Sequence, residues 1–211
     1  MCGRAPTAAE HPMFARVWAR TAGVVVPDWR RAQLLEHAGG RVLEIGCGDG
    51  RNFRHYPPGV REVVAIEPEP YLRGLAEHAA SAAAVPVRVL AAAAEDLPIG
   101  DGGCDVVIAF LVLCSVADQP VALAEIRRAL APGGELRFYE HVVARRGLAA
   151  GAQRGLDESG LWPRLAGGCH LARDTVAAIR ASGLIVERLR RFPSGPGPLG
   201  VPIAQGVARR S

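Results

Sequence analysis

Three glycines on alternate positions, Gly46, Gly48 and Gly50, directly follow an apolar stretch at residues 41–45. An apolar run of this length is typical of a buried parallel strand, and the glycines after it predict a tight loop with accessible backbone. Without a Cβ in the way, a ligand can lie directly against the main chain of such a loop. A helix expected just after Gly50 would direct its free N–H groups to the same place. The stretch therefore predicts a cofactor cradle.

The charge beside this loop bears on which cofactor it holds. Nicotinamide and flavin folds use G-x-G-x-x-G, in which the glycines serve a pyrophosphate. Here the order is Glu44-x-Gly46-x-Gly48-x-Gly50, with a carboxylate two residues before the first glycine. A carboxylate there would repel a pyrophosphate and suit a cation, which favours S-adenosylmethionine (SAM), with its sulfonium and ammonium groups, over NAD.

A second carboxylate, Glu67, ends the apolar stretch at residues 62–66, about 20 positions beyond the glycines. An acidic residue at this distance binds the two hydroxyls of a ribose through charge-assisted hydrogen bonds. Because the ends of adjacent parallel strands meet at one edge of the sheet, Glu67 and Gly46 are expected side by side. The alternative for Glu67 is a surface residue in a turn.

With the pattern E-x-G-x-G-x-G in place, the chain resembles the class I SAM-dependent methyltransferases. The resemblance implies a single α/β domain with a Rossmann-like, doubly wound sheet of seven strands, the last one antiparallel. It implies SAM as cofactor and S-adenosylhomocysteine as product. In this family the loop that borders the adenine usually reads G-D-A-E-x-L-P, whereas Ala93 stands here in place of the Asp. Contacts from the backbone of Ala94 and from Glu95 remain available.

Four further stretches narrow the resemblance to the methyltransferase-like 7 group. They are L-V-L-C-S-V at 111–116, R-A-L-A-P-G-G at 128–134, Y-E-H-V at 139–142 and G-C-H-L-A-R at 168–173. The better-known animal members of this group are thiol S-methyltransferases that begin with an apolar membrane anchor. This chain begins Met-Cys-Gly-Arg-Ala-Pro instead, so a soluble, cytoplasmic enzyme is expected, with a substrate that can differ.

The elements that must position these residues follow from periodicity and from turn residues. Residues 1–40 are expected to form a helical prefix or lid, with Asp28 as a cap and with Trp18 and Trp29 packed in the core or, for Trp18, against the substrate. Residues 41–211 form the expected methyltransferase domain. Its strands are expected at 41–45, 62–66, 87–91, 104–110, 135–141, 184–189 and 202–209, and its helices at 51–56, 68–80, 120–130 and 174–182. Residues 145–168 show weak periodicity and are expected to cover the acceptor side.

Methyl transfer from a sulfonium is an in-line displacement, so the protein mainly has to place the nucleophile near the methyl carbon in a dry pocket. A thiol acceptor needs no strong base, whereas an oxygen or nitrogen acceptor is helped by one. His141, next to Glu140 at the end of a strand, is the first candidate; the alternative is that this pair only anchors the local loop. The candidate cofactor-binding residues are Glu44, Gly46, Cys47, Gly48, Gly50, Asn52, Glu67, Pro68, Ala94, Glu95 and Leu111. The candidate substrate-binding residues are Trp18, Cys114, His170 and Arg173.

Composition excludes several other classes of protein. The formal charge is +4, but all 25 basic residues are Arg and they are scattered, so no stripe for nucleic acid is expected. No apolar run is long enough to cross a membrane. The five cysteines form no C-x-x-C pair and have no His at metal-binding spacing, so free thiols and no metal site are expected.

The sequence predicts an enzyme that methylates a small, rather apolar acceptor, as a monomer or homodimer. Sulfur is favoured by the resemblance, and the oxygen or nitrogen of a secondary metabolite is the close alternative. A SAM- or S-adenosylhomocysteine-binding regulator without catalysis is the alternative from another class.

Overall fold

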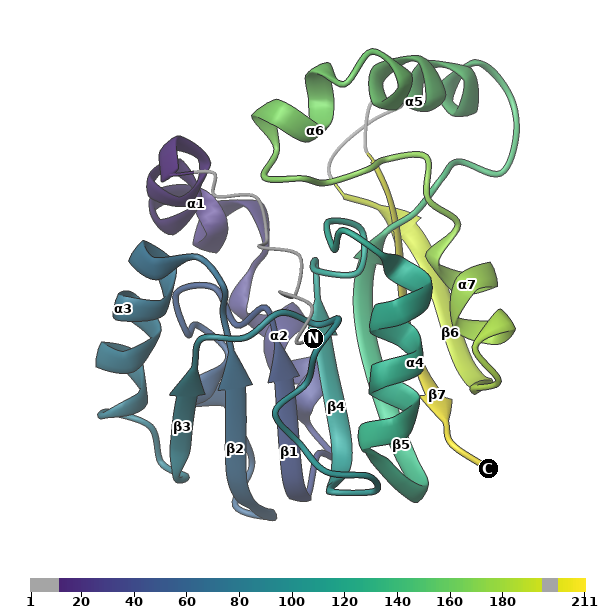
Figure 1. The fold of residues 1–211 in the computed structure, drawn as a ribbon. Helices are drawn as coiled ribbons and strands as arrows, with labels where there is room; N and C mark the ends of the chain where they lie inside the picture. The colour runs from purple at the N-terminus through teal and green to yellow at the C-terminus, as the bar shows by residue number, and fades with distance from the viewer. Residues whose placement is uncertain (1–11, 195–200) are drawn as a thin grey trace, which may run out of the picture.

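The computed structural model describes residues 12–194 and 201–211 and consists of one mixed sheet with helices on both faces (Figure 1). The strands, in chain order, are β1 (Gly40–Ile45), β2 (Val60–Ile66), β3 (Val87–Leu90), β4 (Cys104–Phe110), β5 (Leu130–His141), β6 (Ile185–Pro193) and β7 (Pro202–Arg209). The helices are α1 (Pro12–Val25), α2 (Asp28–Leu35), the short 3-10 helix η1 (Phe53–His55), α3 (Pro70–Ala80), α4 (Gln119–Ala129), α5 (Leu148–Glu158), α6 (Leu161–Leu165) and α7 (Thr175–Ala181).

The strand order is β3-β2-β1-β4-β5-β7-β6. All neighbouring pairs are parallel except those made by β7, which runs antiparallel to both β5 and β6. This confirms the predicted doubly wound sheet of seven strands with an antiparallel last strand. The order of the strands along the sheet reverses between β1 and β4, and ligands bind at this point in open sheets of this kind.

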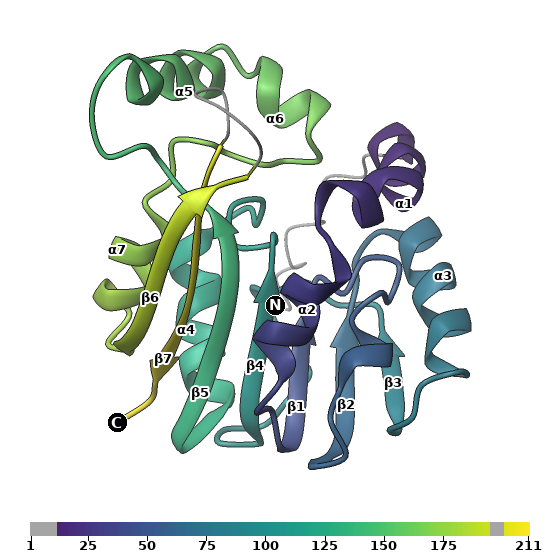
Figure 2. The same ribbon diagram turned by 180° about the vertical axis from the view of Figure 1, so that it is seen from behind.

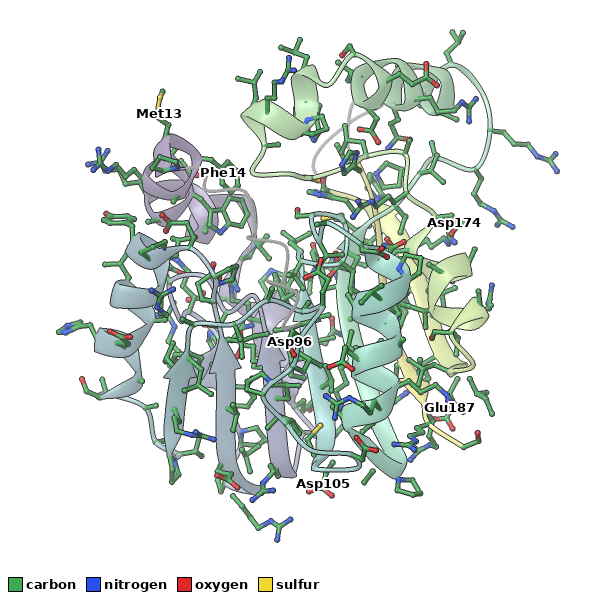
Figure 3. All side chains as sticks on the ribbon, in the orientation of Figure 1. Met13, Phe14, Asp96, Asp105, Asp174 and Glu187 are labelled. Atoms are coloured by element: carbon green, nitrogen blue, oxygen red, sulfur yellow. The ribbon has the colours of Figure 1, made fainter. Side chains whose placement is uncertain are left out.

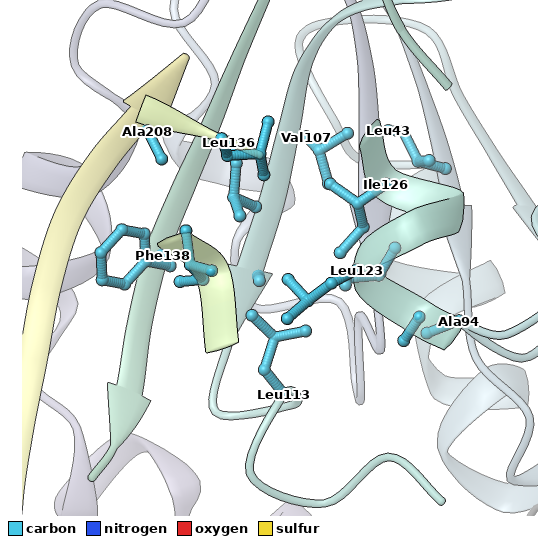
Figure 4. Packing of buried hydrophobic residues seen from close by; sticks show 14 of the residues in the cluster. Leu43, Ala94, Val107, Leu113, Leu123, Ile126, Leu136, Phe138 and Ala208 are labelled. Atoms are coloured by element: carbon cyan, nitrogen blue, oxygen red, sulfur yellow. The ribbon is translucent and has the colours of Figure 1, made fainter. Parts of the chain in front are cut away.

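Two apolar clusters, one on each face of the sheet, hold the layers together. Strand residues alternate between the faces: Leu43 and Ile45 of β1 pack with α4 and α7, whereas Val42 packs with α2, η1 and α3. Figure 4 shows the first cluster around Leu123 and Ile126 of α4, and Figure 2 shows α2 crossing the second face over β1. Because the central strands are covered on both faces, they read as continuous apolar runs in the sequence.

The remaining helices lie beyond the carboxyl ends of the strands. In Figures 1 and 2, α1 stands above the β1 to β3 side of this edge, and α5 and α6 stand above the β5 side. Residues 145–168, which the sequence left unassigned, thus contain two helices. None of the helices in the described part of the chain is long and apolar enough to cross a membrane.

The limits of some elements differ from those expected: β5 already begins at Leu130 and β6 continues to Pro193. Three further local expectations differ from the structure. Asp28 does not cap α2: Pro27 occupies the N-cap position and Asp28 lies in the first turn. Trp29 is 56% exposed and stacks against the guanidinium of Arg30, so its assignment to the core was wrong. The helix expected at 51–56 is a single 3-10 turn, because Pro57 and Pro58 leave no room to extend it. Cys2 and most of the proline-rich loop at 193–198 lie outside the described residues.

Candidate functional site

The glycine loop, residues 46–52, connects the end of β1 to η1. Gly46 and Gly48 have φ angles of +58° and +59°, a conformation that residues with a Cβ adopt at a cost. A Cβ on Gly46 would overlap the side chain of Val112, whereas a Cβ on Gly48 would meet only Trp18, with Nε1 3.9 Å away. Gly46 thus permits close packing against the chain that follows β4. Gly48 leaves accessible main chain, as a cofactor cradle requires.

Glu67 lies beside this loop because β1 and β2 are paired in register up to Ile45 and Ile66. Its two carboxylate oxygens accept hydrogen bonds from the backbone N–H of Gly48 at 2.8 Å and of Glu69 at 3.0 Å. The side chain is buried, and burial raises its pKa. Glu67 therefore fixes the position of the glycine loop, and each oxygen keeps a second lone pair for a donor on a ligand.

Glu44 lies behind the loop and is 1% exposed. Its carboxylate accepts hydrogen bonds from the hydroxyl of Tyr56 at 2.6 Å and from the amide of Asn52 at 2.8 Å. The carbonyl oxygen of Asn52 in turn accepts one from Arg31 at 2.9 Å. Burial raises the pKa of Glu44 to about 7, although the two hydrogen bonds act in the opposite direction. Glu44 thus orients Asn52 and carries a charge that depends on pH near neutrality.

Helix α1 is attached to the glycine loop through Arg51. The guanidinium of Arg51 donates to the carboxylate of Asp49 at 2.7 Å and to the backbone carbonyl of Ala19 at 2.8 Å. The attachment brings the half-buried indole of Trp18 over Gly48. Of the two tryptophans expected to pack in the core, Trp18 is thus the one that lies at the site.

The third side of the site follows β3 and β4. Ala94 is buried, and Glu95 accepts a hydrogen bond from the backbone N–H of Asp118 at 3.1 Å. Leu111, directly after β4, has a φ of +57° and is the one described residue other than glycine with a positive φ. Leucine adopts this conformation at a cost of about 1 kcal/mol or more, and residues strained in this way cluster at functional sites. Its N–H donates to the carbonyl of Tyr139 at 2.7 Å, which holds the strained turn in place.

Glu140 holds the β4–α4 loop, residues 111–118. It is 0% exposed, and its carboxylate accepts three backbone hydrogen bonds, from Val112 and Leu113 at 3.0 Å each and from Cys114 at 3.2 Å. Burial raises its pKa, although these bonds favour the charged form. The structure thus favours the alternative left open by the sequence for this residue: Glu140 anchors the loop.

The carbonyl groups of the same loop are also bonded. Arg173 donates to the carbonyl oxygens of Leu113 at 3.2 Å and of Val116 at 2.7 Å, and the backbone N–H of His170 donates to that of Cys114 at 2.8 Å. The side chain of His170 is 37% exposed, with Nδ1 3.8 Å from Asp157. Arg173 therefore organises the site from the outside, and His170 faces partly toward solvent.

His141 points to the opposite side of β5 from Glu140 and meets two thiols. Its Nδ1 lies 3.4 Å from Sγ of Cys169 and 4.0 Å from Sγ of Cys114, and the two sulfurs are 3.6 Å apart. We call these three residues the thiol–imidazole cluster. The hydrogen bond between the sulfurs raises the pKa of Cys114 and lowers that of Cys169. Burial acts to lower the pKa of His141, but the contact with Cys114 and the neighbouring charges raise it.

Sequence spacing could not reveal this cluster, because its members come from the β4–α4 loop, the end of β5 and the segment after α6. From the sequence, Cys114 was a candidate for substrate binding and Cys169 was expected only to be a free thiol. Both are indeed buried free thiols, as are Cys47 and Cys104. The sequence did contain one signal. Each of the motifs at 111–116, 139–142 and 168–173 contains a Cys or a His.

A hollow of about 630 Å³ lies at the opposite edge of the sheet, where the strands begin. Figure 3 places Asp105 at this edge, away from α1 and Phe14. Its charged residues pair with one another, as in the ion pairs Arg41–Glu62 and Arg61–Asp105. Because the charged side chains that line this hollow form ion pairs with one another, the edge of the sheet at the carboxyl ends of the strands remains the candidate site.

Comparisons with known proteins agree with this geometry. Residues 43–138 match the family model described as "Methyltransferase domain". The human protein named thiol S-methyltransferase TMT1B is 38% identical over 181 residues, which cover 79% of this chain and 72% of that protein. The crystal structure of the [4+2]-cyclase SpnF has a TM-score of 0.74 at 17% identity and covers 97% of both chains. That of a geranyl diphosphate C-methyltransferase from Streptomyces coelicolor, solved with S-adenosyl-L-homocysteine, has a TM-score of 0.67 at 14% identity and covers 87% of this chain and 77% of that one.

Proposed function

The chain belongs to the class I SAM-dependent methyltransferases, and from this premise we propose that it methylates the sulfur of a small, mainly apolar thiol. The relative that is 38% identical over 72% of its own length is named a thiol S-methyltransferase. The surroundings of the thiol–imidazole cluster support an apolar acceptor, because Trp162, Ala166 and Leu171 pack there.

We assign the cofactor to the carboxyl ends of β1, β2 and β4. The main chain around Gly48 accommodates the SAM molecule, and Glu67, next to Pro68, binds the hydroxyls of its ribose. Ala94, Glu95 and Leu111 border the adenine, and Asn52, oriented by Glu44, completes the inner wall. Helix α1, with Trp18 above Gly48, covers the cofactor from outside.

The observation that carries the choice of sulfur is the buried position of Glu140. This carboxylate at the end of β5 is 0% exposed and is directed at three backbone N–H groups of the β4–α4 loop, so it does not reach an acceptor. An alcohol acceptor is helped by such a base. A thiol does not, because its pKa of about 8.5 leaves a few per cent of thiolate at neutral pH.

The test is a competition among acceptors that differ in one atom. The protein is incubated with SAM and with benzyl mercaptan, benzyl alcohol or benzylamine, and the products are identified by mass spectrometry. We expect the methyl thioether from the mercaptan, at a rate at least about 100-fold above those of the other two acceptors. Below pH 8 the rate should rise with pH, because the thiolate fraction of the acceptor rises.

A matched control is Gly46→Val, which places a side chain against Val112 at a positive φ and should abolish binding of S-adenosylhomocysteine in calorimetry. Preferred methylation of the alcohol or the amine would contradict the choice of sulfur. Tight binding of SAM with no methylation of any acceptor would favour a regulatory protein instead.

A further inference from the structure

The thiol–imidazole cluster brings together three groups that bind soft metal ions. Within the described residues, Cys114, His141 and Cys169 each offer one ligand atom, and these atoms all lie within 4.8 Å of one another. Two sulfurs and one imidazole nitrogen are a donor set typical of zinc, and the catalytic site of alcohol dehydrogenase uses this set.

The separations match the edges of a tetrahedron around zinc. With Zn–S of about 2.3 Å and Zn–N of about 2.1 Å, tetrahedral geometry requires about 3.8 Å between two sulfurs and about 3.6 Å between sulfur and nitrogen. The corresponding distances here are 3.6 Å between the sulfurs, and 3.4 Å and 4.0 Å from Nδ1 of His141 to Cys169 and Cys114. Each edge is within about 0.4 Å of the required value, so an ion can enter with small rotations of the three side chains.

The surrounding chain fixes all three ligands. Cys114 is held through its backbone N–H, bonded to Glu140, and through its carbonyl, bonded to the N–H of His170. The backbone N–H of Cys169 donates to the carbonyl of Ala166 at 3.1 Å. His141 ends β5, where it is paired with Ile203 of β7. These contacts hold the main chain of all three ligands in place, so only their side chains must rotate to meet an ion.

The indole of Trp162 lies next to the thiol–imidazole cluster and packs on Cys114, Cys169 and Leu171. Its buried Nε1 has no acceptor at hydrogen-bond distance among the described residues, although, together with the contact from Cys114, its proximity lowers the pKa of Cys169. A buried N–H without an acceptor costs about 1 to 3 kcal/mol. A metal-bound thiolate would supply the acceptor, because thiolate sulfur carries the negative charge that a neutral thiol lacks.

From these observations we propose that Cys114, His141 and Cys169 bind a zinc ion whose fourth position takes the sulfur of the acceptor. The role at the fourth position rests on the proposed thiol S-methylation, whereas the metal site itself does not. Three protein ligands with one open position are the arrangement of catalytic zinc sites. In this arrangement His141 acts through the metal, in place of the base role expected from the sequence.

The chemistry of the step is balanced. On binding to zinc the acceptor thiol loses its proton to water, because a coordinated thiol is deprotonated. The zinc-bound sulfur then forms a bond to the methyl carbon of SAM while the bond from that carbon to the sulfonium breaks. The products are the neutral methyl thioether and S-adenosylhomocysteine. The thioether is the weaker ligand because it carries no charge, so it leaves the metal.

The test uses cobalt(II) as a spectroscopic probe for zinc in the full chain, kept reduced with a phosphine that is not itself a thiol. Cys2→Ser is included in every protein, because Cys2 lies outside the described residues. We expect one equivalent of cobalt to give the intense visible bands of tetrahedral coordination together with thiolate-to-cobalt charge transfer. Zinc should displace the cobalt.

Two variants test the ligands, and a third is the control. Cys169→Ser and His141→Ala should each weaken zinc binding by more than about 100-fold, since loss of even an outer partner of a metal ligand costs about 10- to 100-fold. Cys104→Ser is the matched control: this thiol is also buried, but it donates to the carbonyl of Ala129 at 3.2 Å, away from the cluster, and its loss should leave the affinity unchanged. Binding of S-adenosylhomocysteine by each variant verifies that it is folded.

Each outcome decides a part of the proposal. The metal site is overturned if the parent protein shows no thiolate-to-cobalt charge transfer, or if folded Cys169→Ser binds zinc with unchanged affinity. It is also overturned if Cys114 and Cys169 form a disulfide under the reducing conditions of the experiment. Benzyl mercaptan, added without SAM, should shift the cobalt bands, whereas benzyl alcohol should not. If the mercaptan leaves the cobalt bands unchanged, the acceptor does not bind at the fourth position. If the protein methylates the mercaptan but binds no cobalt, the proposed function holds and the metal site does not.

Discussion

At the carboxyl ends of β1 and β2 the site consists of main chain from one continuous stretch, residues 44–52, supported by Glu67. At the carboxyl ends of β4 and β5 it consists of side chains that converge from positions 114, 140, 141 and 169. The first region consists of accessible main chain, so its sequence is contiguous and rich in glycine. The second is built from tertiary contacts, so its parts are distant in the chain. The comparison teaches that a backbone-lined site can be read from spacing, whereas a side-chain-lined one requires the fold.

The largest expected effect would break the second region. Glu140→Ala leaves the N–H groups of Val112, Leu113 and Cys114 without their acceptor in a buried place. We expect the free energy of unfolding to fall by about 3 to 5 kcal/mol, measured by urea denaturation. Glu158→Ala, at an exposed position of α5, is the control and should stay within about 0.5 kcal/mol. Equal effects of the two substitutions would mean that the β4–α4 loop does not depend on Glu140.

The next effect probes the buried charge behind the first region. Because burial raises the pKa of Glu44 to about 7, the folded state binds its proton more tightly than the unfolded state does. The stability that this group contributes is therefore complete below its unfolded pKa of about 4.3, and it is lost as the pH rises through the folded pKa. Between pH 5 and pH 8 we expect the parent protein to lose roughly 2 to 3 kcal/mol relative to Glu44→Gln, which cannot ionise. The free energy of unfolding of both proteins is measured by urea denaturation at pH 5 and pH 8. An equal change in the two proteins between these pH values would contradict the prediction.

The smallest effect sharpens the assignment of the cofactor to the first region. Glu67→Ala should weaken binding of S-adenosylhomocysteine by about 1.5 to 3 kcal/mol, or roughly 10- to 100-fold, because charge-assisted hydrogen bonds are lost. Glu69→Ala is a matched control: it removes the N-cap of α3, whose carboxylate accepts from Leu72, and should reduce stability by about 1 kcal/mol without changing affinity. Calorimetry that shows unchanged affinity for Glu67→Ala would remove this residue from the ribose site.

Much of the fold followed from the sequence because the sheet is covered on both faces. The limits of β4 and β7 were predicted to the residue, and turn residues mark where each begins: Gly102 and Gly103 precede β4, and β7 starts at Pro202. The juxtaposition of Gly46 and Glu67 followed from two parallel strands that end together. The assignment of these residues to cofactor binding is still a prediction.

The errors and omissions lie where tertiary contacts override local pattern. Trp29 was assigned to the core because apolar residues recur around it, yet the face of α2 that meets the sheet is that of Leu34 and Leu35. The sequence indicated that a carboxylate precedes the glycines, but it could not show that Glu44 is enclosed by Tyr56 and Asn52. The expectation of no metal site rested on spacing along the chain, and spacing carries no information about residues as far apart as Cys114 and Cys169.

Helix α1 makes contacts with both regions. On one side Arg51 of the glycine loop donates to the carbonyl of Ala19, and on the other the ring of Phe14 packs directly on the main chain of Gly167, two residues before Cys169. Figure 3 shows Phe14 on the side of α1 that faces this segment. Any departure of α1 from the body of the protein therefore disturbs both contacts in the same movement. On the proposed placement of cofactor and acceptor, one helix therefore borders both compartments of the site.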